Sequence, residues 1–226
     1  MKENNNNSEQ ESSTMTLEYY SQKFWDNFYK NPKLDTRFPI NWYFDITKVK
    51  IDGFFLNDLS KSEEILVLGP GLSSILEYFY ENNYEKITLF DFSEELIQIL
   101  TEKYNKQYNK DWSINFIDIS ETNNSFNSEF NIIIDKGCLD CIISEPKQGQ
   151  DKFIKAFNNL MLLLNDDGVF YYFSTANDRE NLFHLGPKIK YETTKIDLNK
   201  NVDPEFQKFK EEDNIYYLYT IQKIFD

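Results

Sequence analysis

The sequence is poor in the residues that bind metals and form disulfides, with two cysteines and one histidine in 226 residues. Cys138 and Cys141 form a Cys-x-x-Cys pair, but no second pair accompanies them, so a structural zinc site lacks its four ligands. The pair also does not follow a first strand, where a redox dithiol usually lies. We therefore expect no metal site, two reduced thiols on one face of a helix or its first turn, and His184 at the surface.

The chain also lacks an excess of basic residues. It has 38 acidic and 24 basic side chains, and its formal net charge is -14. Nucleic-acid-binding proteins usually carry a basic stripe, so this balance argues against a nucleic-acid partner and suits a basic protein partner. No apolar segment reaches the roughly 20 residues of a membrane-spanning helix, and no signal-type segment opens the chain. We expect a cytoplasmic protein without a membrane contact.

The first sixty residues divide into a polar and an aromatic part. The tract 1–14 is rich in asparagine, serine and glutamate. It can bury too little apolar surface to offset the entropy cost of ordering the chain, so we expect disorder there. Aromatic residues at helical spacing then predict a helix that ends before Pro32, and apolar residues recur at helical intervals through 46–59. We expect 15–60 to form a helical aromatic cap that belongs to one domain with the core at 61–226.

Short apolar runs alternate with amphipathic segments through the rest of the chain. This alternation predicts an α/β fold with a Rossmann-like, doubly wound sheet of seven strands, mostly parallel. No helix-length segment joins the last two runs, so we expect an antiparallel C-terminal hairpin at the sheet edge. The predicted strands are 64–68, 86–90, 112–118, 130–135, 169–174, 188–198 and 215–224, and the main predicted helices are 73–82, 93–108 and 153–164.

The turn after the first predicted strand, Gly69-Pro70-Gly71, organises this pattern. Glycines let the backbone approach a ligand closely, and the helix that follows offers free N–H groups. Asp91 ends the next strand, where a carboxylate can accept from both hydroxyls of a ribose. A dinucleotide motif requires a third glycine, but that position is Ser74. The sequence therefore predicts a nucleotide-type ligand other than a dinucleotide.

Four segments in order make the prediction more specific. They are Leu-Val-Leu-Gly-Pro-Gly-Leu-Ser-Ser at 66–74, Leu-Phe-Asp-Phe-Ser at 89–93, Phe-Ile-Asp-Ile at 116–119, and Phe-Asn-Ile-Ile-Ile-Asp-Lys-Gly-Cys-Leu-Asp at 130–140. This set resembles the class I (seven-β-strand) S-adenosylmethionine-dependent methyltransferases. Together with the aromatic segments 24–29 and 40–43, the last segment is similar to a narrower group, the eukaryotic lysine methyltransferases of translation elongation factor 1-alpha and the related citrate synthase enzyme.

The resemblance implies S-adenosylmethionine as the cofactor and places residues around it. Cap aromatics would contact it, Asp91 would accept from the ribose hydroxyls, and Asp118 would meet the adenine amino group. The implied cofactor-binding residues are Trp25, Tyr29, Trp42, Gly69, Gly71, Asp91, Phe92, Asp118, Ile119 and Lys136. The residues implied at the methyl-transfer site are Asp135, Lys136 and Asp140. A strand-end or helix-capping carboxylate is the alternative for Asp118 and Asp140, and a solvated side chain is the alternative for Lys136.

The resemblance further implies methyl transfer to a lysine of a protein substrate, such as a translation elongation factor, by a monomeric enzyme. The methyl group is bound to a sulfonium, which is already a good leaving group. Transfer to a neutral amine therefore depends mainly on alignment, and we expect no dedicated catalytic base. Aromatic walls would hold the amine, while Asp135 or Asp140 would attract the incoming ammonium. Leu72 departs from the polar residue that the group has at this position. A small-molecule methyltransferase and a non-catalytic binding module therefore remain as alternatives.

Overall fold

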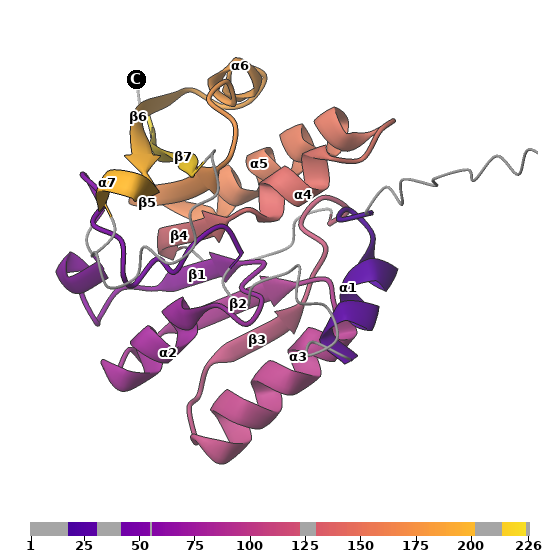
Figure 1. Ribbon diagram of the computed structural model, residues 1–226, viewed down its shortest axis with the longest axis vertical. Coiled ribbons are helices and arrows are strands. Elements are labelled where there is room, and N and C mark those ends of the chain that lie inside the picture. Colours follow the sequence, from indigo (N-terminus) through magenta and orange to yellow (C-terminus); the bar gives the residue numbers. More distant parts are fainter. Residues whose placement is uncertain (1–17, 31–41, 55, 123–129, 202–213, 225–226) are drawn as a thin grey trace, which may run out of the picture.

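The computed structural model describes residues 18–30, 42–54, 56–122, 130–201 and 214–224, which build a sheet between two layers of helices (Figure 1). The strands are β1 Ile65–Leu68, β2 Ile87–Asp91, β3 Ser113–Phe116, β4 Phe130–Lys136, β5 Leu164–Ser174, β6 Ile189–Asp197 and β7 Ile215–Lys223. The α-helices are α1 Gln22–Lys30, α2 Ser74–Glu81, α3 Glu94–Leu100, α4 Cys138–Ile143, α5 Gly149–Leu163, α6 Glu180–Phe183 and α7 Leu198–Asn201. A 3-10 turn, η1, spans Leu56–Asp58, and π-helical turns, η2, span Thr101–Gln107.

The seven strands form one mixed sheet in the order β3-β2-β1-β4-β5-β7-β6. The pairs from β3 to β5 are parallel, whereas β7 pairs antiparallel with both β5 and β6. This topology confirms the predicted doubly wound sheet with an antiparallel C-terminal hairpin. Because the strand order reverses between β1 and β4, the carboxyl ends of β1, β2 and β4 meet at a topological switch point, where such sheets bind ligands.

Alternate residues of β1 pack into separate cores on the two faces of the sheet. Ile65 and Val67 join the core that contains α2, α3 and the described part of the cap. Leu66 and Leu68 join the core built from α4, α5 and α6. All four residues are buried, which explains why β1 is apolar throughout and does not alternate with polar residues.

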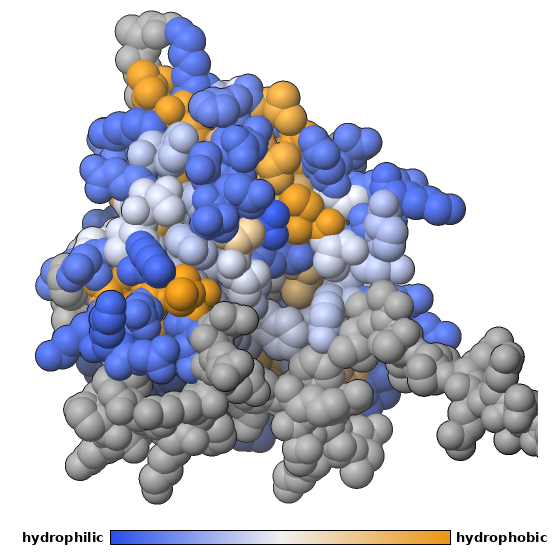
Figure 2. All heavy atoms as spheres, turned by 45° about the horizontal axis from the view of Figure 1, so that its top comes forward, coloured by the Kyte–Doolittle hydropathy of each residue, from blue (hydrophilic) through white to orange (hydrophobic). Residues whose placement is uncertain are grey.

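The described surface is mostly polar, and Figure 2 shows one face on which hydrophilic side chains predominate. Four large apolar side chains remain well exposed, namely Phe116, Leu162, Leu185 and Ile224. Among the described residues, no helix has the length and apolar character needed to cross a bilayer.

The described residues of the segment 46–59, which are 46–54 and 56–59, do not form the predicted helix. They form turns, an isolated antiparallel bridge between Ile51 and Phe54, and η1. Gly53 adopts a φ of 79°, in the left-handed region, which a right-handed helix cannot include. The apolar residues of this segment pack against the sheet without forming a helix. Ile51 and Phe54 are buried in the core on the α2 side of the sheet.

Smaller differences concern the ends of elements. The described part of the first predicted helix begins at Gln22, and α5 begins at Gly149, four residues earlier than predicted. The strand predicted at 169–174 begins earlier, since β5 starts at Leu164, which pairs with Phe130 before a register irregularity in β4. The tract 1–14, Pro32 and residues 40–41 lie outside the described residues.

Candidate functional site

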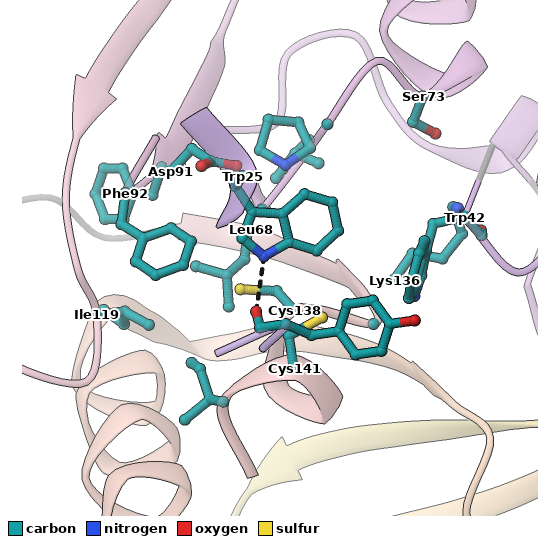
Figure 3. Close-up of a pocket in the computed structure, with 18 of the residues that line it drawn as sticks. Trp25, Trp42, Leu68, Ser73, Asp91, Phe92, Ile119, Lys136, Cys138 and Cys141 are labelled. Atoms are coloured by element: carbon teal, nitrogen blue, oxygen red, sulfur yellow. Dashed lines mark hydrogen bonds between the residues drawn. The ribbon is translucent and has the colours of Figure 1, made fainter. Parts of the chain in front are cut away.

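A cavity lies at the carboxyl ends of β1, β2 and β4, and Figure 3 shows the side chains that surround it. Its walls come from the turn after β1, the end of β2, the loop after β3, the end of β4, helix α4 and the aromatic residues of the cap. All ten residues that the sequence implied for cofactor binding line this cavity. Segments that are far apart in sequence thus meet at the switch point of the sheet.

The glycine turn brings backbone unusually close to the neighbouring elements. Gly69 has a φ of 52° and Gly71 a φ of 54°, both in the left-handed region. A Cβ atom on Gly69 would lie 2.6 Å from the Cβ of Cys138, and one on Gly71 would lie 3.2 Å from the Tyr29 hydroxyl oxygen. Both glycines are therefore required by conformation, and Gly69 is also required by close packing against α4.

Ser73 precedes α2 and adds a polar group that the sequence prediction missed. Its side chain makes no cap bond to the helix, although Ser73 is only 6% exposed. Within the described part of the chain, its buried Oγ has no hydrogen-bond partner. A buried polar group without a partner costs about 1–3 kcal/mol. Since Ser73 lines the cavity, a polar group of a ligand at the start of α2 would offset that cost.

Asp91 is the last residue of β2 and a buried acid in the cavity wall. The Ser93 N–H donates to its Oδ1 at 2.9 Å. Burial raises the pKa of Asp91 to about 7, and the nearby Asp26 charge adds to this shift, while the Ser93 and Phe92 N–H groups oppose it. A carboxylate that has lost most of its water suits a ligand that donates hydrogen bonds, as a ribose does.

Asp118 and two apolar residues form another part of the wall. Asp118 Oδ1 accepts from the Ser120 N–H at 2.9 Å and from the Ser120 hydroxyl at 2.6 Å, so the carboxylate stabilises a turn after β3. Figure 3 shows Phe92 and Ile119 on the side of the cavity away from Trp42. The strand-end alternative for Asp118 is therefore observed, and it is compatible with a place in the cavity wall. Phe92 and Ile119 offer apolar surface for a flat ring.

Asp135 does not line the cavity, in contrast to its expected place at the methyl-transfer site. It is fully buried, and its two oxygens accept from the N–H groups of Cys138 at 2.7 Å and Leu139 at 2.9 Å. Burial raises the pKa of Asp135 to about 8, although these two N–H groups act against the rise. Side chains alternate along a strand, so Ile134 and Lys136 face the cavity and Asp135 points away to cap α4.

Asp140 also lies outside the cavity lining. Its carboxylate accepts from the hydroxyls of Tyr43 at 2.6 Å and Ser174 at 2.8 Å, and from Arg179 Nε at 3.1 Å. The Tyr172 hydroxyl also donates to it. Asp140 therefore joins α4, the end of β5 and the aromatic cap, and it caps neither a helix nor a strand.

Lys136 lies in the cavity wall and is not a solvated lysine. Its Nζ donates to the backbone carbonyl of Trp42 and lies 6.0 Å from the centre of the Phe44 ring. Burial lowers the pKa of Lys136 to about 8, while Asp45 and Asp135 act in the opposite direction. Lys136 thus ties the end of β4 to the cap and retains a substantial neutral fraction near pH 8.

Aromatic rings of the cap cover the cavity. Figure 3 shows the Trp25 ring across it, and the dashed line is the bond from Trp25 Nε1 to the Tyr19 carbonyl oxygen, 2.7 Å long. Trp42 packs edge-on against both Tyr19 and Trp25, with ring centres 5.3 Å and 5.6 Å apart. Trp25 stacks on Tyr29 at 5.9 Å. These four residues form what we call the aromatic cover.

Several lining residues were not predicted as site residues, namely Tyr19, Phe28, Ser73, Cys138, Cys141, Glu145 and Lys152. Phe28 is one of the aromatic residues at helical spacing and could have been found from that pattern, whereas Tyr19 precedes α1. Glu145 and Lys152 form a 3.0 Å ion pair, but neither belongs to a recognisable motif. Cys138 and Cys141 lie on α4 as free thiols, as expected, and burial raises the pKa of each. No cluster of possible metal ligands occurs among the described residues.

Solved structures identify the class of fold. The N-methyltransferase NodS from Bradyrhizobium japonicum, in complex with S-adenosyl-L-homocysteine, aligns with a TM-score of 0.53 and 13% identity, over 70% of this chain and 76% of that one. A TehB-like methyltransferase from Corynebacterium glutamicum aligns with a TM-score of 0.51 and 15% identity, over 74% and 83%. The chain has the fold of the class I S-adenosylmethionine-dependent methyltransferases, as its motifs indicated.

Sequence comparison points to particular relatives. The chain is 27% identical over 128 residues to the eEF1A lysine and N-terminal methyltransferase of Danio rerio, and 24% identical over 132 residues to that of Homo sapiens. These matches cover 57% and 58% of this chain, but only 18% of either relative. The chain therefore spans less than one fifth of the length of these relatives. No family model matches it.

Proposed function

We propose that this chain binds S-adenosylmethionine in the cavity and transfers its methyl group to the side-chain amine of a protein lysine. The observation that carries the cofactor assignment is the meeting of the Gly69–Gly71 turn with Asp91 at the switch point of the sheet. The turn lets a ligand approach the backbone, and the acid suits a ribose. The unpartnered Ser73 hydroxyl and the apolar pair Phe92 and Ile119 fit the polar and flat parts of the same molecule.

Each part of the wall then has a binding task. Asp91 would hold the ribose hydroxyls, and Asp118 would accept from the adenine amino group beside Phe92 and Ile119. The turn at Gly69 and the Ser73 hydroxyl would hold the amino-acid end. When bound, the cofactor supplies a methyl group on a positively charged sulfur, which is electrophilic without further activation.

The residues near the acceptor act by orientation and by control of charge. The aromatic cover presents ring faces and edges that exclude water and can hold an amine or its cationic product. Loss of water favours the neutral form of a lysine amine, as it does for Lys136 in the same wall. Asp135 and Asp140 are occupied by structural hydrogen bonds, so neither is assigned to acid–base chemistry.

The lysine substrate is supported by the relatives, which are described as eEF1A lysine and N-terminal methyltransferases. The formal charge of -14 suits a basic protein such as a translation elongation factor.

A methyl-labelling experiment tests the proposal. The purified chain and isotope-labelled S-adenosylmethionine are incubated with a cell extract, and protein and low-mass fractions are analysed by mass spectrometry. Labelled lysine in a protein is the expected result, and the Asp91→Ala variant serves as the weakened control. Label only in a low-mass compound would indicate a small-molecule methyltransferase instead. Cofactor binding without any transfer would indicate a non-catalytic module.

Ligand binding should also depend on pH through Asp91. The ribose hydroxyls donate to the ionised carboxylate, and its pKa of about 7 means that this form is lost as the pH falls. Affinity for 5′-methylthioadenosine, which has the ribose but no amino acid, is therefore expected to rise up to about tenfold from pH 6 to pH 8. Titrations of the wild type and Asp91→Asn at both pH values test this. The variant lacks the titrating carboxylate but keeps Lys136, whose pKa is about 8, so any pH dependence that remains in the variant comes from a group other than Asp91. An equal pH dependence in both proteins would exclude Asp91 as its source.

A further inference from the structure

Helix α1 is attached to the core through the first turn of α3. Asp26 Oδ1 accepts from the Ser93 hydroxyl at 2.6 Å and more weakly from the Glu95 N–H at 3.5 Å. At the end of α1, Lys30 forms an ion pair with Glu95 at 3.1 Å. These contacts join the helix that carries Trp25 and Tyr29 to the segment that directly follows Asp91.

Ser93 is the centre of this connection. It is fully buried, its N–H donates to Asp91 at 2.9 Å, and its hydroxyl oxygen accepts from the Leu96 N–H at 3.3 Å as the cap of α3. The same hydroxyl donates its proton to Asp26. One serine therefore links the acid at the ribose position, the start of α3 and the helix of the aromatic cover.

We propose that Asp26 is a positioning residue, which fixes α1 against Ser93 so that Trp25 and Tyr29 are held over the cofactor cavity beside Asp91. This inference rests on the proposed function, because it gives the contact a role in cofactor binding.

The length of α1 makes such a contact necessary. A helix of nine residues is too short to be stable alone in water, so its position depends on tertiary contacts. Ring-to-ring contacts of the cover are broad and allow a helix to slide or rotate. Trp25 and Tyr29 are four residues apart and share one helix face, whereas Asp26 is offset by one residue. The buried Ser93 hydroxyl donates a charge-assisted hydrogen bond to Asp26. This bond fixes the rotation of α1 that turns both rings toward the cavity.

Affinity for S-adenosyl-L-homocysteine tests the proposal in four proteins. Asp26→Ala removes the acceptor and is expected to weaken binding about tenfold. Asp26→Asn keeps an oxygen that can accept from Ser93 and is expected to restore affinity to within about threefold of the wild type. Asn27→Ala changes the next, exposed residue of α1 and is expected to bind like the wild type. Equal affinity of Asp26→Ala and the wild type would overturn the proposal.

Limited trypsin digestion gives a second readout at Lys23 and Lys30, both on α1. With S-adenosyl-L-homocysteine present, Asp26→Ala is expected to be cut there faster than the wild type, while the core stays intact. Equal cleavage rates would overturn the proposed contact. If Asp26→Ala fails to fold, Ser93→Ala removes the same hydrogen bond from the core side. Unchanged affinity for S-adenosyl-L-homocysteine in that variant would also overturn the proposal. Failure of the wild type to bind would instead refute the proposed function.

Discussion

Asp91→Ala is expected to weaken binding of S-adenosyl-L-homocysteine by about 10- to 100-fold. Asp91 is 8% exposed and lies at the end of β2, so its hydrogen bonds to a ribose would be shielded from water. Hydrogen bonds to a charged group are worth about 1.5–3 kcal/mol, and each 1.4 kcal/mol is about tenfold in affinity. Calorimetric titration of both proteins measures the loss.

Thermal unfolding separates this effect from damage to the fold. Burial raises the pKa of Asp91 to about 7, so the ionised side chain is a cost to the protein without ligand. Asp91→Asn removes that charge and keeps the shape, and we expect it to melt no lower than the wild type while it binds more weakly. Unchanged affinity in both variants would show that Asp91 does not hold the ribose.

Gly69→Ala is expected to cost about 2–4 kcal/mol of stability and to abolish detectable cofactor binding. The left-handed backbone at Gly69 costs a non-glycine residue about 1–2 kcal/mol. The new Cβ would also lie 2.6 Å from the Cβ of Cys138, which is fixed to the backbone of α4 and cannot rotate away. Denaturant unfolding and ligand titration measure the two losses.

Three further substitutions separate backbone strain from the steric clash. Gly53 has a φ of 79°, but a Cβ there would have no atom within 4 Å, so Gly53→Ala should show the strain alone. Replacing Cys138 by glycine in the Gly69→Ala background removes the clashing atom and should recover part of the stability. Cys138→Ala keeps that Cβ and removes only the Sγ, which would lie 2.9 Å away, so it should recover less. Equal stability of both double variants would show that the clash is not the cause.

Local patterns were sufficient to predict the fold and the centre of the site. Apolar runs of strand length, separated by amphipathic segments, specify β1 to β5 because each pattern reflects burial on the faces of a sheet. The turn at Gly69 and the acid at 91 are recognisable because a left-handed turn requires glycine and a strand-end carboxylate follows at a fixed interval. The other residues implied for cofactor binding came from the resemblance to the methyltransferases, and all ten line one cavity.

The direction of the side chains at the end of β4 was harder to predict. Asp135 and Lys136 are neighbours in sequence and were both implied at the methyl-transfer site, but successive residues of a strand face opposite sides. Lys136 lines the cavity and Asp135 caps α4. Asp140 is engaged by Tyr43 and Arg179, about 97 and 39 residues away in sequence. Contacts over such distances leave no periodic trace, so no local pattern could reveal them.

The pattern of residues along the chain specifies the strands and helices, the glycine turn after β1 and the acid at the end of β2, because these depend on local burial and backbone geometry. Which polar groups face the cavity depends instead on how the elements pack together. Packing turns Lys136 and Ser73 toward the cavity, uses Asp135 and Asp140 to join elements, and brings Asp26 to Ser93. Hydrogen bonds between distant elements are set by packing and not by spacing along the chain, so local patterns do not reveal them.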